Sequence, residues 1–147
     1  MNELVGLLLR SETLSINPGV NQLEHALQTA ALARRAGAAS DLVFGALMHD
    51  VGRLSQPAAH GCASAELIAP FVSHETYWTV RMHDDIRLLE LADANGPVSR
   101  AADYAGEPWF PLACRFAGEW DRYAFVPEAP VMPLPFYLPM LEELCNN

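Results

Sequence analysis

The stretch ALMHDVGR, residues 46–53, decides both the expected fold and the expected chemistry of this chain. Its apolar residues continue a helical pattern, His49 and Asp50 close that pattern, and Gly52 ends the helix. Neighbours on an α-helix diverge by about 100°, so His49 and Asp50 reach one site only at a helix end or when two ions straddle them. Burying an unpaired carboxylate is costly, which makes a cation the simplest partner for Asp50. The stretch therefore predicts a metal site at the end of a buried helix.

The composition suits one ordered domain over residues 1–147, with 51% hydrophobic and 18% charged residues. A net charge of −9 disfavours contact with nucleic acid or with an anionic membrane surface. Cys62, Cys114 and Cys145 are widely spaced and form no CxxC pair, so we expect neither a disulfide framework nor a zinc knuckle. We also expect no secretory signal and no membrane span. These features predict a cytoplasmic protein and leave its oligomeric state open.

Apolar residues recur at intervals of three and four along most of the chain, whereas patterns typical of strands are nearly absent. Prolines, glycines and capping residues divide this pattern into segments. In chain order, we expect helices from Leu4 to a turn at residues 15–19, from Asn21 to Gly37, from Ser40 to Gly52 with Ser40 and Asp41 as caps, from His60 to Ile68, and from a cap at Ser73 through His83 to a break at residues 95–97.

The last third of the chain contains more proline. Pro108 is expected to start a helix that continues from Trp109 to Tyr123 through Asp121. Beyond it, the prolines of residues 126–139 predict an extended segment that wraps the bundle, followed by one or two helical turns. The sequence thus predicts an all-α fold, a single compact helical bundle without internal repeats.

Four of the five histidines lie on different expected helices or at a helix start, so a bundle can aim them at one point. A histidine taken alone is more often a surface or hydrogen-bonded core residue than a ligand. Here, however, imidazoles occur together with two aspartates, and a carboxylate can bridge two ions ~3.5–4 Å apart. The joint pattern predicts a site for two metal ions. The candidate ligands are His25, His49, Asp50, His60, His83 and Asp121.

Other polar residues near these histidines have less specific roles. Asn21, Gln22 and Glu24 stand beside His25 and could orient ligands from outside the site, although a polar helix face is the simpler expectation. His74 matches no ligand position, and we expect it to be solvated. No catalytic residue beyond the candidate ligands is identifiable.

Two arginines are candidates for substrate binding. Arg87 follows His83 by four residues and Arg53 follows His49 by four, so each guanidinium lies one helical turn from a candidate ligand. A guanidinium can clamp a phosphonate, phosphate or carboxylate with two hydrogen bonds. The alternative for each is an exposed arginine paired with a nearby acid such as Asp84.

The order H-(x)23-HD-(x)9-H-(x)22-H-(x)37-D resembles the HD-domain superfamily of metal-dependent phosphohydrolases over essentially the whole chain. The resemblance implies that the six candidate ligands hold two metals, with Asp50 as the bridge. Simpler members use one metal and lack counterparts of His60 and His83, whose presence favours the binuclear form. Binuclear hydrolases of cyclic dinucleotides carry a similar set, so the ligands alone leave the reaction open.

Three stretches are similar to a branch that contains the mixed-valent diiron oxygenase of hydroxy-aminoethylphosphonate, with myo-inositol oxygenase as a more distant relative. These are NQLEHALQ at residues 21–28, ALMHDVG at residues 46–52 and HGCASAEL at residues 60–67. Arg87 stands where that branch carries a lysine.

The chain departs from this branch at positions that concern the substrate. Ser15 and Pro18 replace a tyrosine and a glutamate, Arg53 replaces a histidine, and Gly118 replaces a basic residue. These differences point away from an aminoalkylphosphonate substrate and leave the candidate metal site intact.

Two enzymatic hypotheses follow. The resemblance implies a dioxygen-dependent oxygenase with two divalent or trivalent metals, iron before manganese or zinc, that oxidises or cleaves a small hydroxylated, anionic, phosphonate-like molecule. The alternative is a phosphohydrolase in which two ions lower the pKa of a shared water towards ~7 for attack on a small phosphoester or nucleotide. Residues 101–147 contain only Arg115 and Arg122 as cations, which favours a small substrate. The full ligand set argues against a purely structural or sensing module.

Overall fold

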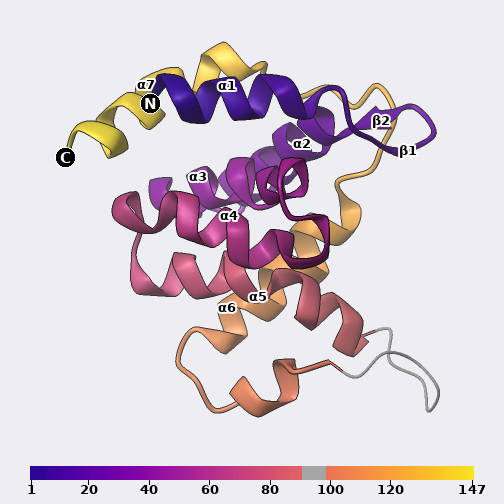
Figure 1. Ribbon diagram of the computed structural model, residues 1–147, viewed down its shortest axis with the longest axis vertical. Helices are drawn as coiled ribbons and strands as arrows, with labels where there is room; N and C mark the ends of the chain where they lie inside the picture. The colour runs from indigo at the N-terminus through magenta and orange to yellow at the C-terminus, as the bar shows by residue number, and fades with distance from the viewer. Residues whose placement is uncertain (91–98) are drawn as a thin grey trace.

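Seven α-helices and one two-stranded hairpin account for most of residues 1–90 and 99–147, which the computed structural model describes. In Figure 1, α1 and α7 lie across one end of the bundle, where both termini are found. None of the helices in the described residues is long and apolar enough to cross a membrane. The predicted break at residues 95–97 lies outside the described residues. The predicted all-α fold with one compact domain is confirmed.

The chain begins with α1 (Asn2–Ser11), followed by an antiparallel hairpin of β1 (Ser15–Asn17) and β2 (Val20–Asn21). Gly19 has a φ of +80° in the hairpin turn, a conformation that glycine adopts without a steric penalty. The predicted turn at residues 15–19 is confirmed. The pattern gives no sign of the strands, because two or three residues carry too little alternation.

A capping box starts α2 (Gln22–Arg35). The Asn21 side chain accepts a hydrogen bond from the Glu24 backbone N–H at 2.9 Å, and the Glu24 carboxylate accepts one from the Asn21 N–H at 2.8 Å. Gly37, with a φ of +77°, follows the helix end. The predicted helix from Asn21 to Gly37 is confirmed, and Asn21 and Glu24 serve as its cap.

The start of α3 (Ser40–Met48) differs from the expectation. Its N-cap is Ala39 and makes no side-chain cap, so the predicted capping role of the residues that follow is wrong. Instead, Asp41 Oδ2 accepts hydrogen bonds from the Ser73 backbone N–H and the Thr76 hydroxyl, each at 2.9 Å. Asp41 thereby ties the start of α3 to the start of α5.

Close backbone approach joins α4 (His60–Ile68) to α5 (His74–Glu90). A Cβ at Gly61 would lie 2.8 Å from the Arg81 carbonyl oxygen, so only glycine lets the two helices meet there. The Ser73 side chain accepts a hydrogen bond from the first turn of α5, which confirms the predicted cap. The predicted helix from His60 to Ile68 is also confirmed.

The helix expected from Pro108 starts later and is not regular. α6 (Phe110–Arg115) has Pro111, rather than Pro108, in its first turn, where the missing N–H costs no hydrogen bond. It continues as a π-helical turn (Phe116–Trp120) and a 3-10 turn (Asp121–Tyr123). A π turn inserts an extra residue, which rotates the following side chains by about 100° relative to a regular α-helix. The irregularity therefore decides where Asp121 points.

The extended segment ends earlier than expected, because α7 (Leu134–Asn146) begins within residues 126–139. The prediction is wrong beyond Pro133. Pro135 lies in the first turn, and only Pro139 interrupts the helix interior, at a cost of about 3 kcal/mol. Three large side chains buried on one face, at roughly 1.5–3 kcal/mol each, offset that cost. The buried residues are Leu134, Tyr137 and Leu141.

Candidate metal centre

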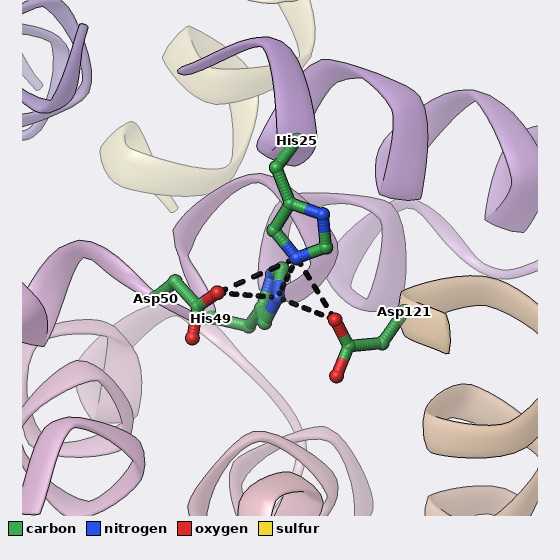
Figure 2. Close-up of side chains that lie close together, drawn as sticks. All are labelled: His25, His49, Asp50 and Asp121. Atoms are coloured by element: carbon green, nitrogen blue, oxygen red, sulfur yellow. Dashed lines mark hydrogen bonds and ion pairs between the residues drawn. The ribbon is translucent and has the colours of Figure 1, made fainter. Parts of the chain in front are cut away.

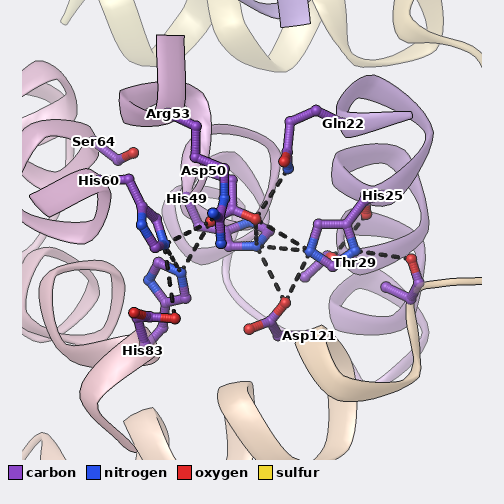
Figure 3. Close-up of polar contacts among 12 residues, drawn as sticks. Gln22, His25, Thr29, His49, Asp50, Arg53, His60, Ser64, His83 and Asp121 are labelled. Atoms are coloured by element: carbon purple, nitrogen blue, oxygen red, sulfur yellow. Dashed lines mark hydrogen bonds and ion pairs between the residues drawn. The ribbon is translucent and has the colours of Figure 1, made fainter. Parts of the chain in front are cut away.

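The six candidate ligands come from five separate segments of the chain, and the structure brings them all together (Figure 3). α2 supplies one histidine, the first residue of α4 and the middle of α5 supply two more, and the turn after the π helix supplies the last aspartate. The His-Asp pair follows α3, which ends at Met48 and not at Gly52 as predicted, because the chain continues as a 3-10 turn over Val51–Leu54. All are buried, with exposed fractions of 5% or less. They are His25, His49, Asp50, His60, His83 and Asp121.

One half of the centre gathers His25, His49, Asp50 and Asp121 (Figure 2). Nε2 of His25 lies 2.8 Å from Asp121 Oδ1, and Nε2 of His49 lies 3.2 Å from Asp50 Oδ2. The two Nε2 atoms are 3.1 Å apart. Two imidazoles and two carboxylates therefore face one another within ligand reach of a single ion.

The other half gathers Asp50, His60 and His83. Nε2 of His60 and Nε2 of His83 each lie 3.1 Å from Asp50 Oδ1, and they are 3.3 Å from each other. Asp50 is thus shared: Oδ2 faces the first pair of histidines and Oδ1 faces the second (Figure 3). This buried His/Asp cluster could hold two metal ions on one shared carboxylate.

All four imidazoles turn the other ring nitrogen, Nδ1, towards a backbone carbonyl oxygen. Because a carbonyl oxygen only accepts hydrogen bonds, each Nδ1 carries a proton, and a neutral ring keeps the lone pair of Nε2 for a metal. The contacts are His25 to Ala124 at 2.8 Å, His49 to Ala46 at 2.7 Å, His60 to Pro57 at 3.0 Å and His83 to Val80 at 2.6 Å. In this tautomer, the buried Asp121 Oδ1 faces the Nε2 lone pairs of His25 and His49 at 2.8 and 3.3 Å and has no hydrogen-bond donor. The residues present therefore fit a metal.

The electrostatics of the cluster also favour a cation at its centre. Burial by itself lowers the pKa of His49, but the carboxylates of Asp50 and Asp121 raise it to about 10. Burial by itself raises the pKa of Asp121 and Asp50, but the surrounding histidines hold both well below the usual range. Protons provide the positive charge when no metal is bound, and a metal would have to displace them.

Gly52 explains why the His-Asp pair and His60 come together. A Cβ at Gly52 would lie 2.3 Å from the His60 carbonyl oxygen and 2.9 Å from the Ser64 backbone nitrogen. The Gly52 N–H also donates to Ser64 Oγ at 2.9 Å. Only a residue without a side chain lets the first turn of α4 dock on the turn that follows Asp50.

Both candidate arginines lie against the carboxylates of the centre. Arg53 Nε is 3.4 Å from Asp50 Oδ1, and Arg87 Nη1 is 3.6 Å from Asp121 Oδ2. The Arg87 guanidinium also lies over the Phe125 ring, 5.5 Å from its centroid. Each arginine side chain is about one third exposed, so the cations stand between the buried centre and solvent.

Gln22 contacts the centre, although a polar helix face was the simpler expectation. Its side chain is buried, and Nε2 donates to Asp50 Oδ2 at 3.0 Å (Figure 3). The available signal is the spacing, because Gln22 precedes His25 by three residues and shares its helix face. Sequence reasoning missed Phe125, whose ring stacks on His25 with centroids 4.1 Å apart, and no pattern marks that contact. His74 is exposed, as expected.

Comparison with known proteins agrees with this geometry. The family model for the HD domain matches residues 23–125, a range that contains all six residues of the cluster. A search of curated proteins finds no match. Since the matched range covers well over half of the sequence, the chain belongs to the HD domain family.

Proposed function

We propose that the chain is a binuclear metalloenzyme. His25, His49, Asp50 and Asp121 would hold one metal ion, and Asp50, His60 and His83 would hold the other. The division of the Asp50 carboxylate between two pairs of imidazoles supports this assignment, because one mononuclear site would use only part of the set. Membership of the HD domain family supports metal dependence.

The reaction that we propose is dioxygen-dependent oxidation or cleavage of a small hydroxylated anion, with iron as the metal. The observation that supports it is the half formed by Asp50, His60 and His83. Two histidines and one carboxylate are the donor set of many non-haem iron oxygenases, in which the remaining positions accept dioxygen and substrate. When bound, iron would supply the redox chemistry with dioxygen, and the three buried side chains would hold it away from bulk water.

The protein's own contribution to substrate binding would come from Arg53 and Arg87. Each guanidinium lies at the edge of one half of the centre, with about one third of the side chain exposed. Each can therefore exchange part of its contact with Asp50 or Asp121 for an incoming oxyanion. This arrangement supports a phosphonate, phosphate or carboxylate group on the substrate.

Phosphoester hydrolysis is the second candidate. The shared Asp50 carboxylate supports it, because hydrolases that use two metals also need a bridging group to hold both ions close to one water. The same arginines would then bind the phosphoryl oxygens.

An oxygen-electrode screen separates the two candidates. Protein loaded with ferrous iron under anaerobic conditions is mixed with small hydroxylated phosphonates and polyols, and dioxygen uptake is recorded. In parallel, protein loaded with manganese is assayed for phosphate release from small phosphoesters. We expect substrate-dependent dioxygen uptake. Phosphate release without any dioxygen uptake would replace the oxygenase with the hydrolase.

A further inference from the structure

Unsatisfied polar atoms collect around the metal centre. In the described part of the chain, five buried side-chain nitrogen or oxygen atoms lack a hydrogen-bond partner, and three of them surround Asp50. Buried polar atoms are almost always paired, so a group of unpaired atoms needs an explanation. The three atoms are Gln22 Oε1, Arg53 Nε and Asp121 Oδ1. A metal ion accounts for the carboxylate oxygen, but it does not account for the arginine donor.

The orientation of the Gln22 amide is fixed by its neighbour. Nε2 donates to Asp50 Oδ2 at 3.0 Å, and a flipped amide would place one oxygen against another. Oε1 is therefore left as a buried acceptor without a donor. Gln28, on the same helix, shows the contrast, because its Nε2 donates to the Val126 carbonyl and its Oε1 accepts from the Val126 N–H.

The Arg53 guanidinium lies on the other oxygen of the same carboxylate. Its Nε is 3.4 Å from Asp50 Oδ1 but makes no hydrogen bond. In Figure 3, Arg53 and Gln22 reach Asp50 from above, one on each side of its carboxylate. One unused acceptor and one unused donor thus flank a single carboxylate, beside the two predicted metal positions.

We infer that Gln22 and Arg53 form a recognition pair for an anion that retains an O–H group, such as a hydrogen phosphate or hydrogen phosphonate. Gln22 Oε1 accepts the O–H of the ligand, and the Arg53 guanidinium binds its negative oxygens. A fully ionised oxyanion would place an oxygen against Oε1 and leave both acceptors without a proton. The inference rests on the proposed function, since the anion binds at the metal-loaded centre, and it narrows the substrate to this class.

The test compares inorganic phosphate with sulfate, which have similar size and shape. At about pH 6.5 phosphate retains at least one proton, whereas sulfate retains none. Binding of each anion to manganese-loaded protein is measured by calorimetry, with metal content determined on the same samples. We expect phosphate to bind at least about tenfold more tightly than sulfate, although its charge is no larger.

Three variants test which side chains cause the preference for phosphate over sulfate. Gln22→Met keeps the side-chain size and should reduce the ratio of phosphate to sulfate affinity to about one, while Arg53→Met should weaken both anions and keep the ratio. Gln28→Met is the matched control, because its amide is already satisfied, and it should leave the ratio unchanged. Both affinities in each ratio are measured on the same variant with the same metal content, so a change in metal occupancy affects both and does not alter the ratio.

Several outcomes would overturn the inference. Equal binding of the two anions by the wild-type protein, binding of neither, or a wild-type ratio in Gln22→Met would each show that ordered water, rather than a ligand, satisfies these atoms. If the protein takes up metal but does not discriminate, only the recognition pair fails. If it takes up no metal, the proposed function fails with it.

Discussion

The two halves of the centre differ in donors and in surroundings. The half with His25 and His49 has two carboxylates, and the Phe125 ring stacks on His25, whereas Phe116 contacts an imidazole of each half. The half with His60 and His83 has only the shared Asp50 carboxylate. In the proposed centre, the first half would offer a metal four protein donors and the second three, which would leave more positions there for other ligands.

The two halves also differ in their distance from solvent. His25 and His49 are fully buried, with exposed fractions of 0%. His60 lines a cavity of about 380 Å³ at the surface, together with Asp84 and Arg100. The second half therefore borders a surface cavity through His60, and the following changes probe the two halves separately.

Removing the shared carboxylate should have the largest effect. Asp50→Ala deletes a donor from both halves, and it leaves Asp121 as the remaining carboxylate of the cluster, next to His25 and His49. We expect loss of most bound metal and a lower melting temperature of the metal-loaded protein. Element-resolved metal analysis after anaerobic loading checks this. Metal content equal to that of the wild type would show that Asp50 is not the bridge.

Adding a methyl group at Gly52 should separate the two halves. Gly52→Ala places a Cβ 2.3 Å from the His60 carbonyl oxygen, so the first turn of α4 must move and carry His60 with it. We expect about one metal ion to be lost from the second half, together with roughly 1–3 kcal/mol of stability.

Gly6→Ala provides the control, since apart from its chain neighbours and the adjacent backbone of its own helix no atom lies within 4 Å of the added Cβ. This change should keep both metals and alter stability by no more than about 1 kcal/mol. Equal metal content in the two variants would show that docking of α4 does not control the second half.

Truncating Arg87 should change substrate binding without emptying either half. The guanidinium contacts Asp121 and stands at the edge of the centre. With the substrate found by the dioxygen screen, Arg87→Met should raise KM by about tenfold or more and leave metal content unchanged. Unaltered kinetic constants would remove Arg87 from the substrate site.

Asp41 gives the smallest effect and serves as a reference outside both halves. Burial by itself raises its pKa, but hydrogen bonds from Ser73 and Thr76 lower it overall. A lowered pKa stabilises the fold above the ordinary aspartate range, and that contribution disappears as pH falls through the lowered value. Asp41→Ala should cost about 1 kcal/mol near neutral pH and less in acid, with both metals retained. Thermal melts across pH measure this, and a difference that grows in acid would contradict it.

The sequence predicted the members of the cluster because their side chains carry chemistry that spacing can reveal. His25, His49, Asp50, His60 and His83 lie on or next to four different helices, and their imidazole and carboxylate groups can be recognised in the sequence as metal ligands. The backbone carbonyls that accept hydrogen bonds from the histidines, such as that of Ala124, could not be predicted from the sequence, because every residue has the same carbonyl group. Docking of Phe125 on His25 depends on tertiary packing, which no local pattern carries.

The errors in the fold prediction have a similar origin. A regular 3.6-residue period cannot reveal the π turn that precedes Asp121. The prolines near the C-terminus predicted an extended chain because their local cost is evident, whereas the burial of Tyr137 and Leu141 that offsets it depends on the rest of the bundle. Gln22 was harder to place, because a glutamine at a helix start is equally suited to solvent and to a buried carboxylate.

The count of metal ions per chain tests the central claim most directly. Wild-type protein is loaded anaerobically with ferrous iron, freed of unbound metal and measured by element analysis against protein concentration. The geometry of the Asp50 carboxylate predicts two iron ions per chain. One ion per chain, or none, would contradict a binuclear centre.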